Sequence, residues 1–220
     1  MEAPEAIRTM SAMLKSGEAP GWKAQLKACP PGRPSDPEAS QGHGRKAGVM
    51  ALLCPDQCGR WSVVLMLRTQ DGSPHSGQLS FPGGAEEPGD HGDLLTTALR
   101  ECREEVGVSV HTSHVLGPLT PLYIPPSQFW VHPFVAWSST TPAFLLQASE
   151  VAEVLLLPLE DLPLAGQSWP FHEVHVGNRT WNTPGCKLGE HILWGATAMM
   201  VAELKEACDR AGFGPSFVSL

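Results

Sequence analysis

Apolar residues gather in short runs along this chain, and polar segments rich in proline and glycine separate the runs. Two runs, Val49–Leu53 and Trp61–Leu67, are almost continuously apolar and are joined by a turn-forming segment, residues 54–60. This arrangement is typical of a β-hairpin, and the lack of polar alternation predicts that both strands are central in a sheet. Shorter apolar runs predict further strands at residues 78–81, 115–119, 122–124, 131–137, 151–157, 171–176 and 180–181.

A helical period of apolar residues occurs in three places. The clearest begins after Asp93, a good N-cap, and ends at Gly107, which follows the last apolar position as a C-terminal cap. Its apolar arc consists of Leu94, Leu95, Ala98, Leu99, Cys102 and Val106. A weaker pattern in residues 1–28 predicts a helix laid against the domain, and residues 194–211 predict a closing helix.

The order of these elements predicts an α/β fold. The strands are interrupted by one helix in the middle and followed by one at the end, which favours a mixed sheet between helices. Residues 29–46 are rich in Pro, Gly and Ser and predict a loop. We therefore expect an N-terminal helix and loop, residues 1–46, packed on one domain formed by residues 47–220. A chain of 220 residues with 42% apolar content supports one substantial core.

Composition narrows the class of function. The net charge of −8 argues against a nucleic-acid partner, because such proteins usually carry a basic face. No apolar run reaches the roughly 18 residues of a membrane span, and the first residues lack the features of a signal peptide. The cysteines form no paired C-x-x-C sets, so Cys54 and Cys58 are expected to be free thiols rather than zinc ligands. We expect a soluble cytoplasmic protein with no membrane partner.

Three carboxylates stand out on the central helix. Glu101, Glu104 and Glu105 are spaced at i, i+3 and i+4, which brings them to one face. Three like charges repel, and oxygen ligands at this density suit Mg²⁺ or Mn²⁺. The alternative is a solvated acidic face. The preceding segment, Phe81–Gly84, favours the metal site because it predicts a tight bend whose backbone comes close to an ion or phosphate.

These residues carry a family resemblance. Gly84, Asp90 and the run from Arg100 to Val108 resemble the Nudix box, G-x5-E-x7-R-E-U-x-E-E-x-G-U, where U is apolar. Asp90 stands in place of the first glutamate, and nine residues instead of seven separate it from Arg100. The helical half of the box matches without gaps. The resemblance implies a Nudix-type α/β/α sandwich with a mixed β-sheet.

A second motif, upstream of the box, resembles the coenzyme A pyrophosphatase branch of the Nudix family as it occurs in bacteria. Arg68 and Gly77 lie at the distances from Phe-Pro-Gly-Gly that this branch uses. Thr69 replaces a serine, and Ser73 stands where the branch has a second arginine. The resemblance implies cleavage of the CoA diphosphate to adenosine 3′,5′-bisphosphate and 4′-phosphopantetheine, with Mg²⁺ or Mn²⁺ as cofactor.

The family resemblance also implies roles for individual residues. Glu101 and Glu105 are the firmest metal ligands, Glu104 is a third ligand, and the Gly83 carbonyl contributes from the bend. Arg100 orients the carboxylates through charged hydrogen bonds. Arg100, Glu104 and Glu105 thus form the catalytic helix face.

A general base is expected outside the box, as in several Nudix enzymes. Glu153 and Glu150 are the candidates, and Glu153 is favoured by its position before the next Leu-Pro segment. Arg68, His75 and Lys46 are candidate phosphate contacts.

The segment 122–130 contains Pro125 and Pro126 between aromatic residues. It predicts either one wall of a substrate pocket, with Tyr123 as a binding residue, or a stiff loop anchored by its aromatics. Two alternative functions stay open: hydrolysis of ADP-ribose, NADH or a damaged nucleotide, and ligand binding without turnover. The sequence also leaves open whether two copies form a homodimer.

Overall fold

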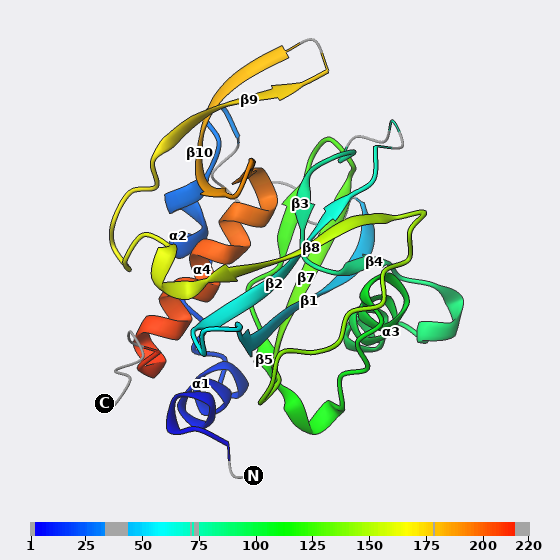
Figure 1. Ribbon diagram of the computed structural model, residues 1–220, viewed down its shortest axis with the longest axis vertical. Helices are drawn as coiled ribbons and strands as arrows, with labels where there is room; N and C mark the ends of the chain where they lie inside the picture. The colour runs from blue at the N-terminus through cyan, green and yellow to red at the C-terminus, as the bar shows by residue number, and fades with distance from the viewer. Residues whose placement is uncertain (1–2, 34–43, 71, 73–74, 178, 214–220) are drawn as a thin grey trace.

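The computed structural model describes residues 3–33, 44–70, 72, 75–177 and 179–213 (Figure 1). Within these residues the chain forms an eight-stranded mixed sheet and a three-stranded antiparallel sheet. The large sheet has the order β3 (Leu79–Ser80), β2 (Trp61–Arg68), β1 (Arg45–Pro55), β7 (Phe129–Trp137) and β5 (Val115–Pro118). Strands β4 (Gly83–Ala85), β6 (Leu122–Ile124) and β8 (Val151–Pro158) pair with β1, β7 and β2 respectively. The small sheet contains β9 (Phe171–Val176), β10 (Arg179–Leu188) and β11 (His191–Trp194).

Helices cover both faces of the large sheet (Figure 1). They are α1 (Glu5–Lys15), α2 (Trp22–Gln25), α3 (Leu94–Val106) and α4 (Gly195–Ala211), with 3-10 turns η1 (Leu26–Ala28), η3 (Pro88–Asp90), η4 (Thr112–His114) and η5 (Leu159–Asp161). Neighbouring side chains of β1 point to opposite faces. Met50 packs with Cys102 of α3, whereas Ala51 belongs to the core that contains Met10 of α1 and Leu204 of α4. The predicted α/β/α sandwich is confirmed.

The predicted hairpin is also confirmed. β1 and β2 pair antiparallel with Leu53 opposite Val63, and both lie inside the sheet. β1 pairs in parallel with β7 on its other side, so the sheet is mixed as expected. None of the helices among the described residues combines the length and apolar character needed to cross a membrane.

Two predicted boundaries are wrong. The predicted loop over residues 29–46 includes the start of β1, because the Arg45 N–H donates to the Gln128 carbonyl oxygen at 2.9 Å and the strand continues beside β7. Residues 34–43 of that loop lie outside the described residues. The closing helix begins at Gly195, and Trp194 ends the unpredicted strand β11. The first error concerns pairing with a distant segment, which local patterns do not report.

The N-terminal pattern forms two helices instead of one, and a buried carboxylate joins this segment to α4. Glu203 is fully buried and accepts hydrogen bonds from Gln25 Nε2 at 2.7 Å, the Gly21 N–H at 3.0 Å and Thr120 Oγ1 at 2.7 Å. Burial raises the pKa of Glu203, and these donors act in the opposite direction. The division into segments 1–46 and 47–220 stays a prediction.

The central helix α3 has the predicted caps and packs directly on the backbone of β1. Asp93 Oδ1 accepts a hydrogen bond from the Leu95 N–H at 3.1 Å, and Gly107 ends the helix with φ of 74°. A Cβ at Gly48 would lie 2.2 Å from the Leu94 carbonyl oxygen. Only glycine allows this approach, which places the carboxylate face of α3 against β4.

Candidate active site

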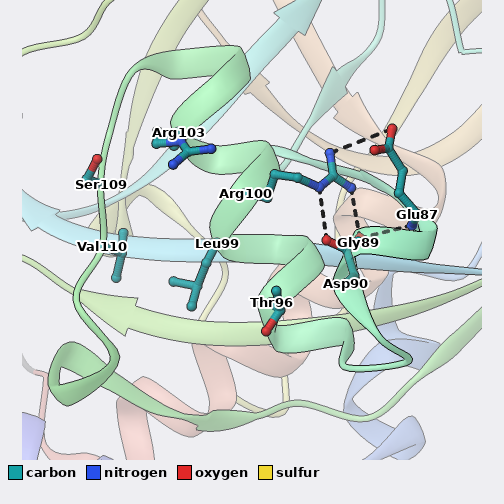
Figure 2. Close-up of a pocket in the computed structure, with 9 residues that line it drawn as sticks. All are labelled: Glu87, Gly89, Asp90, Thr96, Leu99, Arg100, Arg103, Ser109 and Val110. Carbon is teal, nitrogen blue, oxygen red and sulfur yellow. Dashed lines mark hydrogen bonds and ion pairs between the residues drawn. The ribbon is translucent and has the colours of Figure 1, made fainter.

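Arg100 is the centre of the polar network on α3. Its Nε donates to Asp90 Oδ1 at 3.0 Å and its Nη2 to Asp90 Oδ2 at 3.0 Å (Figure 2). Asp90 is buried, and the Arg100 guanidinium holds the pKa of its carboxyl well below the usual range. Asp90 therefore anchors Arg100, although it is shorter than the glutamate of the Nudix box and two more residues than in the box separate it from Arg100.

The other N–H groups of Arg100 are also engaged. Nη1 donates to Glu101 Oε1 at 2.9 Å and to Glu104 Oε2 at 3.1 Å, and Nη2 donates to the Ala85 carbonyl oxygen at 3.1 Å. All five guanidinium N–H groups thus have acceptors. This geometry is the one that the predicted orienting role of Arg100 requires.

Glu105 lies on the buried side of the helix, with only 2% of its surface exposed. Its Oε2 accepts a hydrogen bond from the Gly83 N–H at 2.7 Å, and its Oε1 is 3.6 Å from Arg68 Nη1. Burial raises the pKa of Glu105 to about 8, with further increases from the charges of Glu101 and Glu150. The Gly83 N–H and the charge of Arg68 lower the pKa of Glu105, but burial outweighs them.

Glu101 fits against the glycine bend. A Cβ at Gly84 would lie 2.4 Å from Glu101 Oε1, so the glycine makes room for this carboxylate. Burial raises the pKa of Glu101, and the charges of Glu104 and Glu150 add to the effect while Arg100 opposes it. The charge of Glu150 thus raises the pKa of both Glu101 and Glu105, and the charge of Glu101 also raises that of Glu105.

Glu104 points differently from the other two box glutamates. Its side chain is 50% exposed and lies between Arg100 and Arg103, whose Nη2 is 3.7 Å from Glu104 Oε1. Among the described residues, no three His, Cys, Asp or Glu side chains are grouped closely enough to hold an ion as they stand. The structure thus brings Glu101 and Glu105 together and leaves Glu104 at the rim.

The donor chemistry of this site nevertheless suits a hard divalent cation. Glu101 and Glu105 offer carboxylate oxygens whose charge is disfavoured by burial and mutual repulsion, and a cation would relieve both. The Gly83 N–H is occupied by Glu105, and ligation by the Gly83 carbonyl stays a prediction.

The two candidate bases lie in different surroundings. Glu153 is 55% exposed, and its Oε2 is 3.7 Å from His191 Nε2. Glu150 precedes β8, in a turn held to α3 by a hydrogen bond of 2.9 Å from the Gln147 N–H to the Glu105 carbonyl oxygen. Its charge reaches Glu101 and Glu105, and the structure therefore favours Glu150. The sequence favours Glu153 for its position before the next Leu-Pro segment, and the backbone contact that places Glu150 cannot be read from the sequence.

The predicted phosphate contacts are spread more widely. Arg68 lies at the end of β2 beside Glu105. His75 is half-buried; its Nδ1 is 3.4 Å from Gln78 Oε1, and its buried Nε2 has no hydrogen-bond partner. Burial lowers the pKa of His75, and the charge of Arg68 lowers it further. Lys46 is exposed on β1, and Ser73 lies outside the described residues.

Tyr123 belongs to a β-hairpin. β6 and β7 pair across residues 125–128, with Tyr123 opposite Trp130 and their ring centroids 5.5 Å apart. The Tyr123 carbonyl oxygen accepts a hydrogen bond from Arg33. These contacts match the interpretation as an anchored aromatic segment, and substrate binding by Tyr123 stays a prediction.

The site consists of two carboxylates of α3, Glu101 and Glu105, that lie against the glycine bend at Gly83 and Gly84. The fold that holds them is a mixed sheet between helices. The NUDIX domain profile matches residues 44–176. The chain therefore belongs to the Nudix family, and the resemblance of its box is confirmed.

Individual relatives give more detail. The chain is 38% identical over 127 residues to the human protein described as mitochondrial coenzyme A diphosphatase NUDT8, a match that covers 57% of this chain and 53% of that relative. It thus spans about half the length of this curated relative. It is 34% identical over 158 residues to an uncharacterized Nudix hydrolase, NudL, of Yersinia enterocolitica, covering 71% of this chain and 79% of NudL.

A solved structure supports the fold alone. The crystal structure of a MutT/nudix family protein from Enterococcus faecalis aligns with a TM-score of 0.53 at 18% identity. The alignment covers 73% of this chain and 60% of the other.

Proposed function

We propose that this protein is a metal-dependent pyrophosphohydrolase that cleaves the diphosphate of coenzyme A or its derivatives. The products would be adenosine 3′,5′-bisphosphate and 4′-phosphopantetheine. The observation that carries the proposal is the contact between Arg68 of the upstream motif and Glu105 of the box. It joins the branch-specific motif to the catalytic helix, and the identity to human NUDT8 supports the same substrate.

Nudix hydrolases generally use divalent metal ions. Glu101 and Glu105 would hold Mg²⁺ or Mn²⁺ here, and the bound ion would neutralise phosphate oxygens and lower the pKa of a water molecule. Arg100 keeps Glu101 in place by its hydrogen bond of 2.9 Å. Arg68 would then be released from Glu105 to contact the diphosphate.

Glu150 is the proposed general base. It lies outside the helix but is held near Glu101 and Glu105 by the turn that precedes β8. A carboxylate in this position would accept a proton from the water that attacks one phosphorus, while the bond from that phosphorus to the bridging oxygen breaks and the other phosphate leaves with that oxygen.

Incubation of the full chain with CoA and Mn²⁺ or Mg²⁺, with mass-spectrometric identification of products, tests the proposal. We expect both named products, loss of turnover with EDTA, and no turnover by Glu105→Gln. Parallel reactions with ADP-ribose and NADH form the substrate panel. Intact CoA together with cleavage of ADP-ribose or NADH would reject the CoA assignment. Metal binding without hydrolysis of any diphosphate in the panel would instead favour a ligand-binding domain.

A further inference from the structure

A hollow of about 440 Å³ lies on the outer face of α3 (Figure 2). We call it the back-face hollow. Its lining consists of Glu87, Gly89, Asp90, Thr96, Leu99, Arg100, Arg103, Ser109 and Val110. Ligand sites in proteins commonly have volumes of about 300–1,000 Å³, so the hollow is large enough for a small molecule.

The back-face hollow is separate from the predicted metal ligands. At about 100° per residue, Thr96, Leu99 and Arg103 lie on the opposite side of α3 from Glu101 and Glu105. The exposures agree with this placement, because the Arg103 side chain is 63% exposed whereas Glu105 is buried. A ligand in the hollow would therefore not occupy the side of α3 that carries Glu101 and Glu105.

The lengthened box loop builds one wall of the back-face hollow. Its 3-10 turn is held by a hydrogen bond of 2.9 Å from the Glu87 N–H to Asp90 Oδ2 and another of 2.9 Å from the Asp90 N–H to the Glu87 carbonyl oxygen. Pro88 further restricts the turn. A Cβ at Gly89 would meet no atom within 4 Å, so this residue faces open space. The other wall is formed by Ser109 and Val110, which follow the helix.

The chemistry of the lining is amphipathic. Leu99 and Val110 are half-buried and pack on the core beneath, which gives an apolar floor. Arg100 has no donor to spare, and both oxygens of Asp90 already accept hydrogen bonds. Arg103 has only a long contact of 3.7 Å to Glu104. The cation available to a ligand is therefore Arg103, with the exposed Ser109 beside the same floor.

We propose that the back-face hollow binds a small organic anion, a phosphate or carboxylate attached to an apolar body. The anionic group would contact the Arg103 guanidinium and the Ser109 hydroxyl. The apolar body would rest on Leu99 and Val110. The contacts proposed for this ligand include neither Glu101 nor Glu105, although Arg100, which donates to Glu101, also lines the hollow.

The test is a titration of the ¹⁵N-labelled full chain with phenyl phosphate in EDTA, followed by amide chemical shifts. We expect saturable shifts at Gly89, Arg103, Ser109 and Val110. Arg103→Ala removes the cation. Gly89→Phe adds a bulky ring at the wall of the hollow, where a Cβ meets no atom within 4 Å. Each change should weaken binding at least tenfold. Arg179→Ala removes an exposed arginine elsewhere and should leave binding unchanged. Inorganic phosphate, which lacks the apolar body, should bind at least tenfold more weakly.

Several results would overturn the proposal. One is a set of chemical shift changes confined to the side of α3 that carries Glu105 and faces Gly83. The others are an unchanged affinity of Arg103→Ala for phenyl phosphate, and equal affinities of the unmodified chain for inorganic phosphate and phenyl phosphate. The spectrum of each variant reports its folding. If Gly89→Phe does not fold, Arg103→Ala still tests the proposal, because it changes only an exposed side chain. Because the titration contains no metal, its outcome does not depend on whether CoA is hydrolysed.

Discussion

Asp90 and Arg100 form a two-point ion pair that joins the lengthened loop to the central helix, with both N–O distances at 3.0 Å. The same guanidinium holds Glu101 and Glu104. The loop is therefore connected to the predicted metal site through one side chain. Although Asp90 lies ten residues before Arg100 in the sequence, loosening the loop should therefore displace the carboxylates of Glu101 and Glu104.

Asp90→Asn should destabilise the protein by about 2 kcal/mol, because charged hydrogen bonds to a buried group are lost. The depressed pKa of Asp90 means that its contribution is present above its unfolded pKa and is lost only as pH falls through the lower folded value. Urea unfolding at pH 5 and 7 should therefore show the same deficit. Glu160→Gln, which breaks an exposed pair with Arg60 at 3.3 Å, is the control and should change stability little. Equal effects of the two changes would contradict the role of Asp90.

Glu105→Gln should abolish hydrolysis while the chain stays folded, because the amide keeps the shape of the buried side chain but loses its charge. Glu104→Gln is the matched control, since Glu104 is 50% exposed and tied to arginines. We expect Glu104→Gln to keep measurable turnover. Steady-state assays and circular dichroism of both variants decide the matter. Near-normal turnover by Glu105→Gln would remove it from the ligand set.

Without metal, Glu105 should make stability depend on pH. Its folded pKa of about 8 lies above its unfolded value. Its stabilising contribution is therefore complete below the unfolded value and is lost as pH rises through about 8. The slope for one such group is at most about 1.4 kcal/mol per pH unit. Urea unfolding in EDTA at pH 5, 6, 7 and 8 should show this decline, and Glu105→Gln should flatten it. An identical slope in the variant would assign the decline to other groups.

Glu150→Gln should lower kcat by about 100-fold or more, the usual effect of losing a general base. Glu153→Gln, only three residues away, should leave kcat within a few-fold because its carboxylate lies beside His191. Rates measured at saturating substrate and metal compare the two. The reverse result would return the role to Glu153.

Gly84→Ala should reduce activity strongly with little effect on the fold. Its new methyl would lie 2.4 Å from Glu101 Oε1 and would push that carboxylate away. Gly89→Ala adds the same methyl five residues later, in η3, where a Cβ would meet no atom within 4 Å, and should be neutral. Metal affinity measured by calorimetry should fall only in Gly84→Ala. An unchanged metal affinity of Gly84→Ala would mean that metal binding does not depend on the present position of the Glu101 carboxylate.

Much of the fold followed from local patterns. The apolar runs predicted the β1–β2 hairpin, and the 3.6-residue period with Asp93 and Gly107 predicted α3. Strand β11 was missed because its four residues precede a helix without a break, and its pairing with β10 is formed across a tight turn.

The candidate site was predicted in part. The spacing of the glutamates placed them on one helix, but only the packing of α3 on β1 and β4 decided that Glu105 is buried and Glu104 is exposed. The same holds for Glu150, whose place depends on a backbone hydrogen bond between segments more than forty residues apart in sequence.

The sequence by itself determined which residues share a helix, where that helix begins and ends, and which family the box belongs to. These properties depend on periodicity, caps and residue order, which are local. The tertiary structure alone decided which carboxylates converge, which one meets Arg68, and that Asp90 closes on Arg100. Those outcomes depend on burial and on contacts between distant segments, and such contacts exist only once the sheet has brought the segments together.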